Sequence, residues 1–199
     1  MNNNEGLSND QEIIKFNTIG KSNIKTYSFP NEWFLDIYNN NLTLKNEDIE
    51  NQKKYEELEY FKDLKGVKDE STKPYFTYFK NKNDLLKNSI IDSLFIVDSI
   101  IIKNNRKILT FKTFATLDDN NYEFPLKIYN IDIVLFDGIN TIQSENIYSE
   151  IVYPYYVKQN ICYLDGEGNL YCKKFVIDEE KIYYKGFYEK ELRKIFNLN

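Results

Sequence analysis

The sequence of 199 residues contains no histidine and only 7 glycines, 4 prolines, 2 cysteines and 1 methionine. Without histidine there is no Ser-His-Asp or Cys-His nucleophile, no histidine-ligated zinc or haem, and no imidazole acid or base. Glycine-rich phosphate loops and the Gly-x-Ser-x-Gly elbow are also absent from the sequence. We therefore expect a protein that is not an enzyme, with no catalytic residue, metal site or cofactor.

Arginine is scarce too, since it occurs only as Arg106 and Arg193. The 26 basic and 31 acidic residues give a net charge of −5. Nucleic-acid-binding proteins usually carry a basic surface and use guanidinium groups to bind phosphates and bases. This balance argues against dedicated nucleic-acid binding.

Long hydrophobic runs and a leader sequence are the last features that the sequence lacks. The most apolar run, 93–103, contains Asp98 and is shorter than the ~20 residues of a membrane-spanning helix. No charged and then apolar leader follows Met1. We expect a cytoplasmic or virion protein that is not secreted by a signal peptide and has no membrane partner.

Aromatic residues and asparagine are abundant: 17 Tyr, 14 Phe, 1 Trp and 26 Asn. Because glycine and proline are scarce, asparagine must form many of the turns. An excess of Lys over Arg, together with Asn, Ile, Tyr and Phe, is typical of an AT-rich genome. Genome bias therefore explains part of this composition.

The domain organisation is predicted from changes in polarity along the chain. Residues 1–11 are polar and aperiodic, which is typical of a disordered or partner-ordered tail. We assign residues 12–66 to an N-terminal arm with helices, 67–73 to a charged linker and 74–199 to a β-rich core. The fold class is α+β, with a hairpin-rich antiparallel sheet, an N-terminal helical arm and a short C-terminal helix.

Helical spacing predicts two helices in the arm. In 31–39 the apolar residues recur at i, i+1, i+4 and i+5. In 47–65, Asn46 is a candidate N-cap, and Lys65 followed by Gly66 is a stop signal. The first half of this second helix has few apolar residues, so we expect it to be solvated or projecting.

Within the core, β-branched and aromatic residues predict strands over 94–103, 107–117 and 122–136, in a three-stranded meander. The first two meet at a turn at Asn104-Asn105. In the third, the apolar residues change from even to odd positions, and a bulge near Tyr129-Asn130 explains this change of parity. Short helices are expected over 84–91 and 144–153. A strand over 181–187 and a terminal helix carrying Leu192, Ile195 and Phe196 close the chain.

A second hairpin is predicted over 161–177, with arms that are nearly palindromic about Glu167. This register places Cys162 opposite Cys172, which is within reach of a disulfide. Without a secretion signal we favour two reduced, half-buried thiols, with the disulfide as the alternative.

Contiguous aromatic residues are candidate contact surfaces, because tyrosine and tryptophan combine a large apolar area with a polar group and are enriched at protein interfaces. Ordinary packing in the core is the alternative. The candidate interface residues are Trp33, Phe34, Tyr75, Phe76, Tyr78, Tyr153, Tyr155 and Tyr156.

These observations favour a structural or interaction protein of a larger oligomeric assembly that binds other protein subunits. A phage virion component, such as a connector, tail or capsid accessory protein, is its most concrete form. A small acidic inhibitor that covers a basic surface is the main alternative. A Mg²⁺-dependent hydrolase using Asp165, Glu179 and Lys181 is a weaker one.

Overall fold

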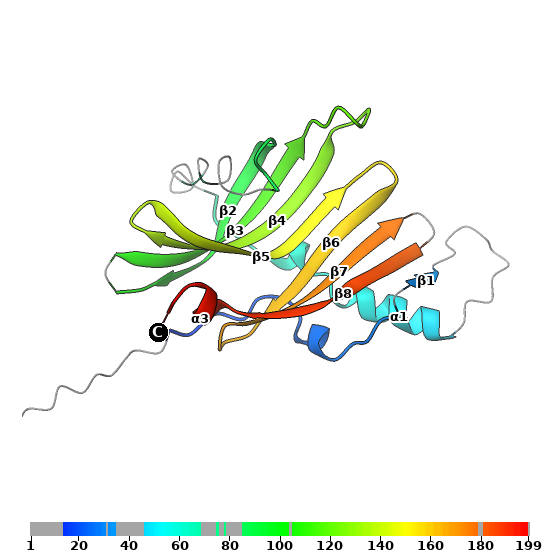
Figure 1. Ribbon diagram of the computed structural model, residues 1–199, viewed down its shortest axis with the longest axis horizontal. Coiled ribbons are helices and arrows are strands. Elements are labelled where there is room, and N and C mark those ends of the chain that lie inside the picture. The colour runs from blue at the N-terminus through cyan, green and yellow to red at the C-terminus, as the bar shows by residue number, and fades with distance from the viewer. Residues whose placement is uncertain are drawn as a thin grey trace, which may run out of the picture.

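An antiparallel sheet of eight strands runs through the molecule in the order β1-β8-β7-β6-β5-β4-β3-β2 (Figure 1). The computed structural model describes residues 14–30, 32–34, 46–68, 75, 78, 85–103, 105–178 and 181–198, and gives the backbone alone for 32–34 and 46–48. From β2 to β8 each strand pairs with the next along the chain, so the predicted antiparallel meander is confirmed. The strands are β1 (Glu32–Phe34), β2 (Ile90–Ile101), β3 (Arg106–Leu117), β4 (Leu126–Asp137), β5 (Asn140–Val152), β6 (Tyr156–Leu164), β7 (Asn169–Asp178) and β8 (Lys181–Glu191).

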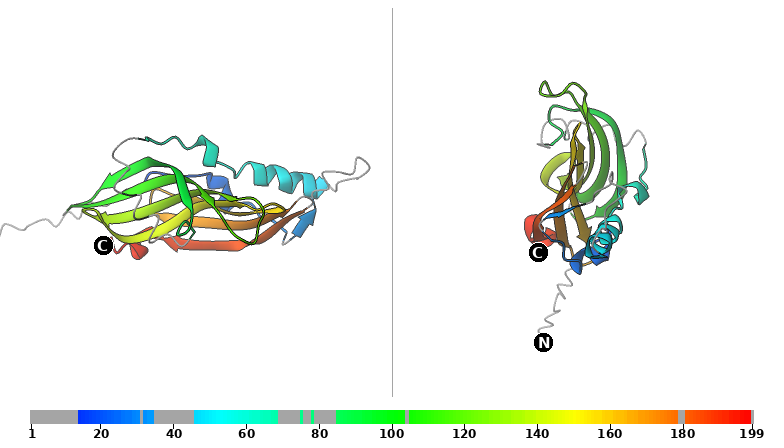
Figure 2. Two further views of the ribbon diagram at one scale, coloured as in Figure 1. Left: turned by 90° about the horizontal axis from the view of Figure 1, so that it is seen from above. Right: turned by 90° about the vertical axis from the view of Figure 1, so that its right-hand side faces the viewer.

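The described helices are short. They are η1 (Ser22–Lys25), α1 (Asn46–Glu56), η2 (Phe61–Asp63) and α3 (Leu192–Ile195), and α3 confirms the predicted terminal helix. The predicted helix 47–65 is wrong in its extent, because α1 ends at Glu56. Beyond it Leu58, Tyr60 and Phe61 turn into the core, and a continuous helix would not bury all three. Figure 2 shows α1 lying along one side of the sheet.

Three other helix predictions are corrected by the structure. In 31–39 the described residues form strand β1, which pairs with β8. In 84–91 the described residues form a turn followed by the start of β2. Residues 144–153 lie mostly in β5, where Ile147 is an extra residue between two consecutive pairs with β4. This bulge puts the buried side chains of Ile147 and Tyr148 next to each other, and so imitates helical spacing.

Strand β4 is buried on both faces. Its register with β3 is continuous, so the predicted bulge near Tyr129-Asn130 is wrong. Ile131, Ile133 and Leu135 lie in one hydrophobic cluster, which also contains Tyr55 of α1 and Phe61 of η2. Ile128, Val134 and Phe136 lie in a second cluster, together with Tyr75 and Tyr78. The change of parity therefore reflects a strand covered on both sides.

Cationic side chains fasten the N-terminal segments to the sheet through backbone carbonyls. Lys112 of β3 is buried, and its Nζ donates to the carbonyl oxygens of Phe61 and Leu64, each at 2.8 Å. Arg193 donates to the carbonyl of Ile14, and Lys173 to that of Tyr27. Residues 14–30 thus lie as an arm on the chain's own sheet.

Candidate functional site

The structure separates the predicted interface residues into distinct places. Tyr75 and Tyr78 are buried in the core, where the Tyr75 ring lies 5.0 Å from that of Phe136, so little of either ring remains for another protein. Trp33 and Phe34 lie in β1, where only the backbone is described. Phe76 lies outside the described residues, as does the predicted tail 1–11.

The three remaining residues belong to an aromatic surface at one end of the sheet. Tyr153 and Tyr156, on either side of the turn between β5 and β6, stack with ring centroids 4.3 Å apart. Tyr122, from the loop between β3 and β4, meets Tyr153 edge-on at 5.5 Å. Phe124 and Tyr155, from the same two loops, are 66% and 74% exposed. We call Tyr122, Phe124, Tyr153, Tyr155 and Tyr156 the aromatic loop cluster.

Charged side chains surround this cluster. The Lys158 Nζ lies 5.1 Å from the ring centroid of Tyr153 and 5.6 Å from that of Tyr156, so the stacked pair receives a cation on its rings. Asp118 and Glu123, on the loop that carries Tyr122 and Phe124, are exposed. Sequence reasoning missed Tyr122 and Phe124, because it placed them inside a strand.

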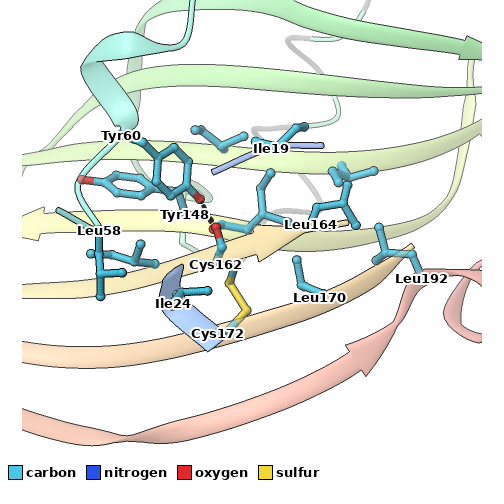
Figure 3. Packing of buried hydrophobic residues seen from close by; sticks show 14 of the residues in the cluster. Ile19, Ile24, Leu58, Tyr60, Tyr148, Cys162, Leu164, Leu170, Cys172 and Leu192 are labelled. Atoms are coloured by element: carbon cyan, nitrogen blue, oxygen red, sulfur yellow. Dashed lines mark hydrogen bonds between the residues drawn. A yellow bond between two sulfur atoms is a disulfide. The ribbon is translucent and has the colours of Figure 1, made fainter. Parts of the chain in front are cut away.

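A second feature is an opening in the sheet between β5 and β6. The two strands pair only from Tyr148 to Val152 and then separate. On the β6 side, Ile19 exchanges both backbone hydrogen bonds with Leu164. Where the strands separate, the Tyr60 hydroxyl lies 3.0 Å from the carbonyl oxygen of Ile147 and 2.5 Å from that of Cys162 (Figure 3). The N-terminal segments therefore fill part of the opening.

Cys162 and Cys172 form a disulfide beside this opening. The predicted register is confirmed, since Leu164, Tyr163 and Cys162 pair with Leu170, Tyr171 and Cys172. The expectation of reduced, half-buried thiols is wrong: the sulfurs are bonded, and both residues are buried. The register places the two residues directly opposite each other, with their Cα atoms 4.0 Å apart.

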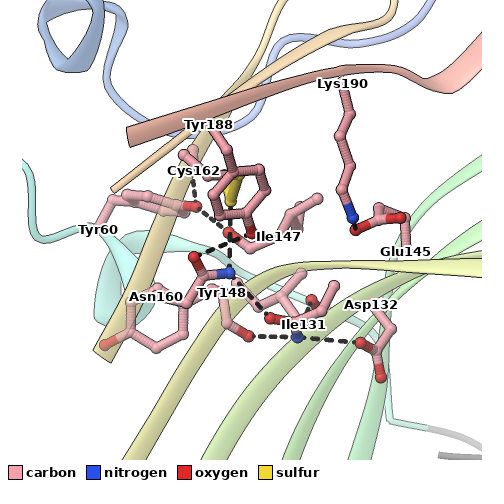
Figure 4. Close-up of a disulfide and its surroundings, with 12 residues drawn as sticks. Tyr60, Ile131, Asp132, Glu145, Ile147, Tyr148, Asn160, Cys162, Tyr188 and Lys190 are labelled. Atoms are coloured by element: carbon pink, nitrogen blue, oxygen red, sulfur yellow. Dashed lines mark hydrogen bonds and ion pairs between the residues drawn. A yellow bond between two sulfur atoms is a disulfide. The ribbon is translucent and has the colours of Figure 1, made fainter. Parts of the chain in front are cut away.

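A chain of polar side chains crosses the sheet near the disulfide (Figure 4). The Tyr188 hydroxyl donates to Asn160 Oδ1, and Asn160 Nδ2 donates to Asn146 Oδ1, both at 3.1 Å. Asn146 Nδ2 lies 2.7 Å from Asn130 Oδ1 and 3.1 Å from Asp132 Oδ1. The chain of donors thus ends on a carboxylate that is 3% exposed. The only signal in the sequence is that asparagine is unusual inside strands.

A groove of about 650 Å³ lies beside the part of β5 that β6 does not reach. Strand β5 forms one wall, and β7, β8 and α3 form the other. Lys190 pairs with Glu145 at 2.5 Å, and Lys194 pairs with Glu191 at 2.7 Å. The residues that line the groove are Gln143, Glu145, Asn169, Tyr171, Glu189, Lys190, Glu191, Lys194 and Ile195.

Asp165, one of the two carboxylates proposed for the hydrolase, serves the β6–β7 turn. Asp165 Oδ1 accepts hydrogen bonds from the backbone N–H groups of Glu167 and Asn169 at 3.0 and 2.9 Å. Although burial opposes it, hydrogen bonds from Asn169 hold the pKa of the Asp165 carboxyl below its ordinary value. Glu179 lies outside the described residues. Among the described residues no group of acidic or cysteine side chains could hold a metal ion.

Comparisons with protein-family models, with curated proteins and with solved structures found no match to this chain. None of the described helices is long and apolar enough to cross a membrane.

Proposed function

We propose that this chain is a non-enzymatic structural protein of a larger assembly and that it contacts a neighbouring subunit through the aromatic loop cluster. The observation that carries the proposal is the stacked pair Tyr153–Tyr156 beside the exposed rings of Phe124 and Tyr155. Aromatic side chains on loops that a sheet holds in place make contact area at low entropic cost. A phage connector, tail or capsid accessory protein is the most concrete form of this role, on composition alone.

An acidic inhibitor that binds one basic partner is the second candidate. It is favoured by the exposed Asp118 and Glu123 beside the cluster and by the net charge of −5. In that role the same rings bind the centre of a basic surface, and the carboxylates bind its rim.

The solution mass of the full chain, alone and co-expressed with the products of neighbouring genes, tests the proposal. A ring or higher oligomer that is lost in the double variant Phe124→Ser, Tyr155→Ser supports the assembly role. The control is Ile139→Ser, because Ile139 is exposed to 79% at the opposite end of the sheet. A monomer that forms a tight one-to-one complex supports the inhibitor. A monomer that binds none of these products contradicts both.

A further inference from the structure

One edge of β5 has no strand partner over more than half of its length. Strand β5 has 13 residues, and β4 pairs with it from Asn140 to Val152. On its other edge β6 reaches only Tyr148, so residues 140–147 have no partner strand there among the described residues. The carbonyl of Ile147 accepts from the Tyr60 hydroxyl, and the remaining outward N–H and C=O groups of such an edge can pair with another chain.

The free stretch coincides with the groove. Bulges at Ile142 and Ile147 bracket a stretch of regular register with β4 from Gln143 to Asn146. Two residues of this stretch, Gln143 and Glu145, line the groove. The groove therefore has the β5 edge on one side and β7, β8 and α3 on the other.

The charges of the groove indicate which segment fits. Its lining contains three glutamates and two lysines. Because Lys190 and Lys194 pair with Glu145 and Glu191, the third glutamate, Glu189, makes no ion pair with a described residue. Tyr171 and Ile195 line the same groove and are its less polar residues.

We propose that this groove binds an extended segment of a partner protein, which adds as a strand to the β5 edge and places a lysine or arginine at Glu189. Backbone pairing supplies affinity in such complexes, and alternate side chains supply specificity. The N-terminal residues of a second copy fit poorly, because residues 1–14 contain acids and no lysine or arginine. The surface is separate from the aromatic loop cluster.

Selection of short linear peptides from a random library on the full-length protein tests the proposal. We expect enriched peptides that alternate apolar and polar residues and contain lysine or arginine. Their binding weakens about tenfold or more in Glu189→Lys and is unchanged in Glu123→Lys, a matched reversal at an exposed loop. Methylation of alternate peptide amides also weakens binding, and hydrogen exchange slows within 141–147.

Three results of the peptide experiment overturn the proposal. The first is that no peptide is enriched over the bare support. The second is that the peptides bind the wild type and Glu189→Lys equally well. The third is that peptide binding slows hydrogen exchange only in segments other than 141–147. Self-association of the chain that Glu189→Lys abolishes also overturns it, because the occupant is then a second copy. The double variant Phe124→Ser, Tyr155→Ser keeps its peptide binding, so this test and that of the proposed function fail independently.

Discussion

The ammonium group of Lys173 donates a hydrogen bond to the backbone carbonyl of Tyr27 at a site where Lys173 makes no ion pair with any described residue. Lys173 is 2% exposed, and its Nζ lies 5.0 Å from the ring centroid of Phe29. Burial lowers the pKa of Lys173 to about 8. A positive charge without a carboxylate thus fastens the N-terminal arm to β7.

This site makes stability depend on pH. Between the folded pKa of about 8 and the ordinary 10.5, the unfolded chain binds more protons at Lys173 than the folded chain does. The free energy of unfolding therefore rises with pH in this window. Between pH 7 and pH 10 we expect the free energy of unfolding of the wild type to rise by about 2–3 kcal/mol more than that of Lys173→Met. Denaturant unfolding at several pH values measures this, and parallel curves for the two proteins contradict it.

Lys174→Met is the matched control for this experiment. Lys174 is the next residue of β7, but it is exposed. Its removal leaves the pH dependence of the wild type unchanged.

The disulfide yields a second prediction. Replacing Cys162 and Cys172 by alanine removes a covalent link from the β6–β7 hairpin, and the free energy of unfolding falls by about 2–3 kcal/mol. Urea unfolding with and without a reductant measures this change. Reductant has no effect on the double variant, which controls for other actions of the thiol reagent. Equal midpoints for the oxidised wild type and the double variant rule out a stabilising role.

The β2–β3 and β6–β7 hairpins could be predicted, because their turns are marked by residues such as Asn105, which adopts φ 63°. Strand β5 could not, since bulges at Ile142 and Ile147 destroy the alternation on which strand prediction depends. The aromatic loop cluster was found in part, through Tyr153, Tyr155 and Tyr156. The groove depends on where β5 and β6 separate, and no local pattern in the sequence encodes this.

The Tyr60 hydroxyl yields a third prediction. Tyr60→Phe keeps the ring but removes the hydroxyl whose single proton is shared between two carbonyl groups, at the point where β5 and β6 separate. The free energy of unfolding falls by about 1–2 kcal/mol. Tyr129→Phe is the control, because its ring packs on Phe61 and its hydroxyl has no hydrogen bond to a described residue. An equal loss in both variants shows that the hydroxyl of Tyr60 does not stabilise the junction.

The polar chain that ends at Asp132 yields the last prediction. Asn146 Nδ2 contacts both Asn130 and Asp132, so Asn146→Leu leaves a buried carboxylate with fewer donors. We expect the free energy of unfolding to fall by about 2–4 kcal/mol. Asp132→Leu removes the charge itself. In that background we expect Asn146→Leu to lower the free energy of unfolding by less than it does in the wild type. A double-mutant cycle from urea unfolding measures this coupling, expected to be about 1 kcal/mol or more.

The matched cycle uses Thr116 and Asp92, whose side chains join β3 and β2 at 2.7 Å in an exposed position. Because water replaces either partner there, its coupling is smaller, about 0.5 kcal/mol. A coupling between Asn146 and Asp132 as small as that of the exposed pair means that the buried chain does not act as a unit. A large coupling means that its amides hold β4, β5 and β6 together beside the opening, and so fix the position of the free β5 edge.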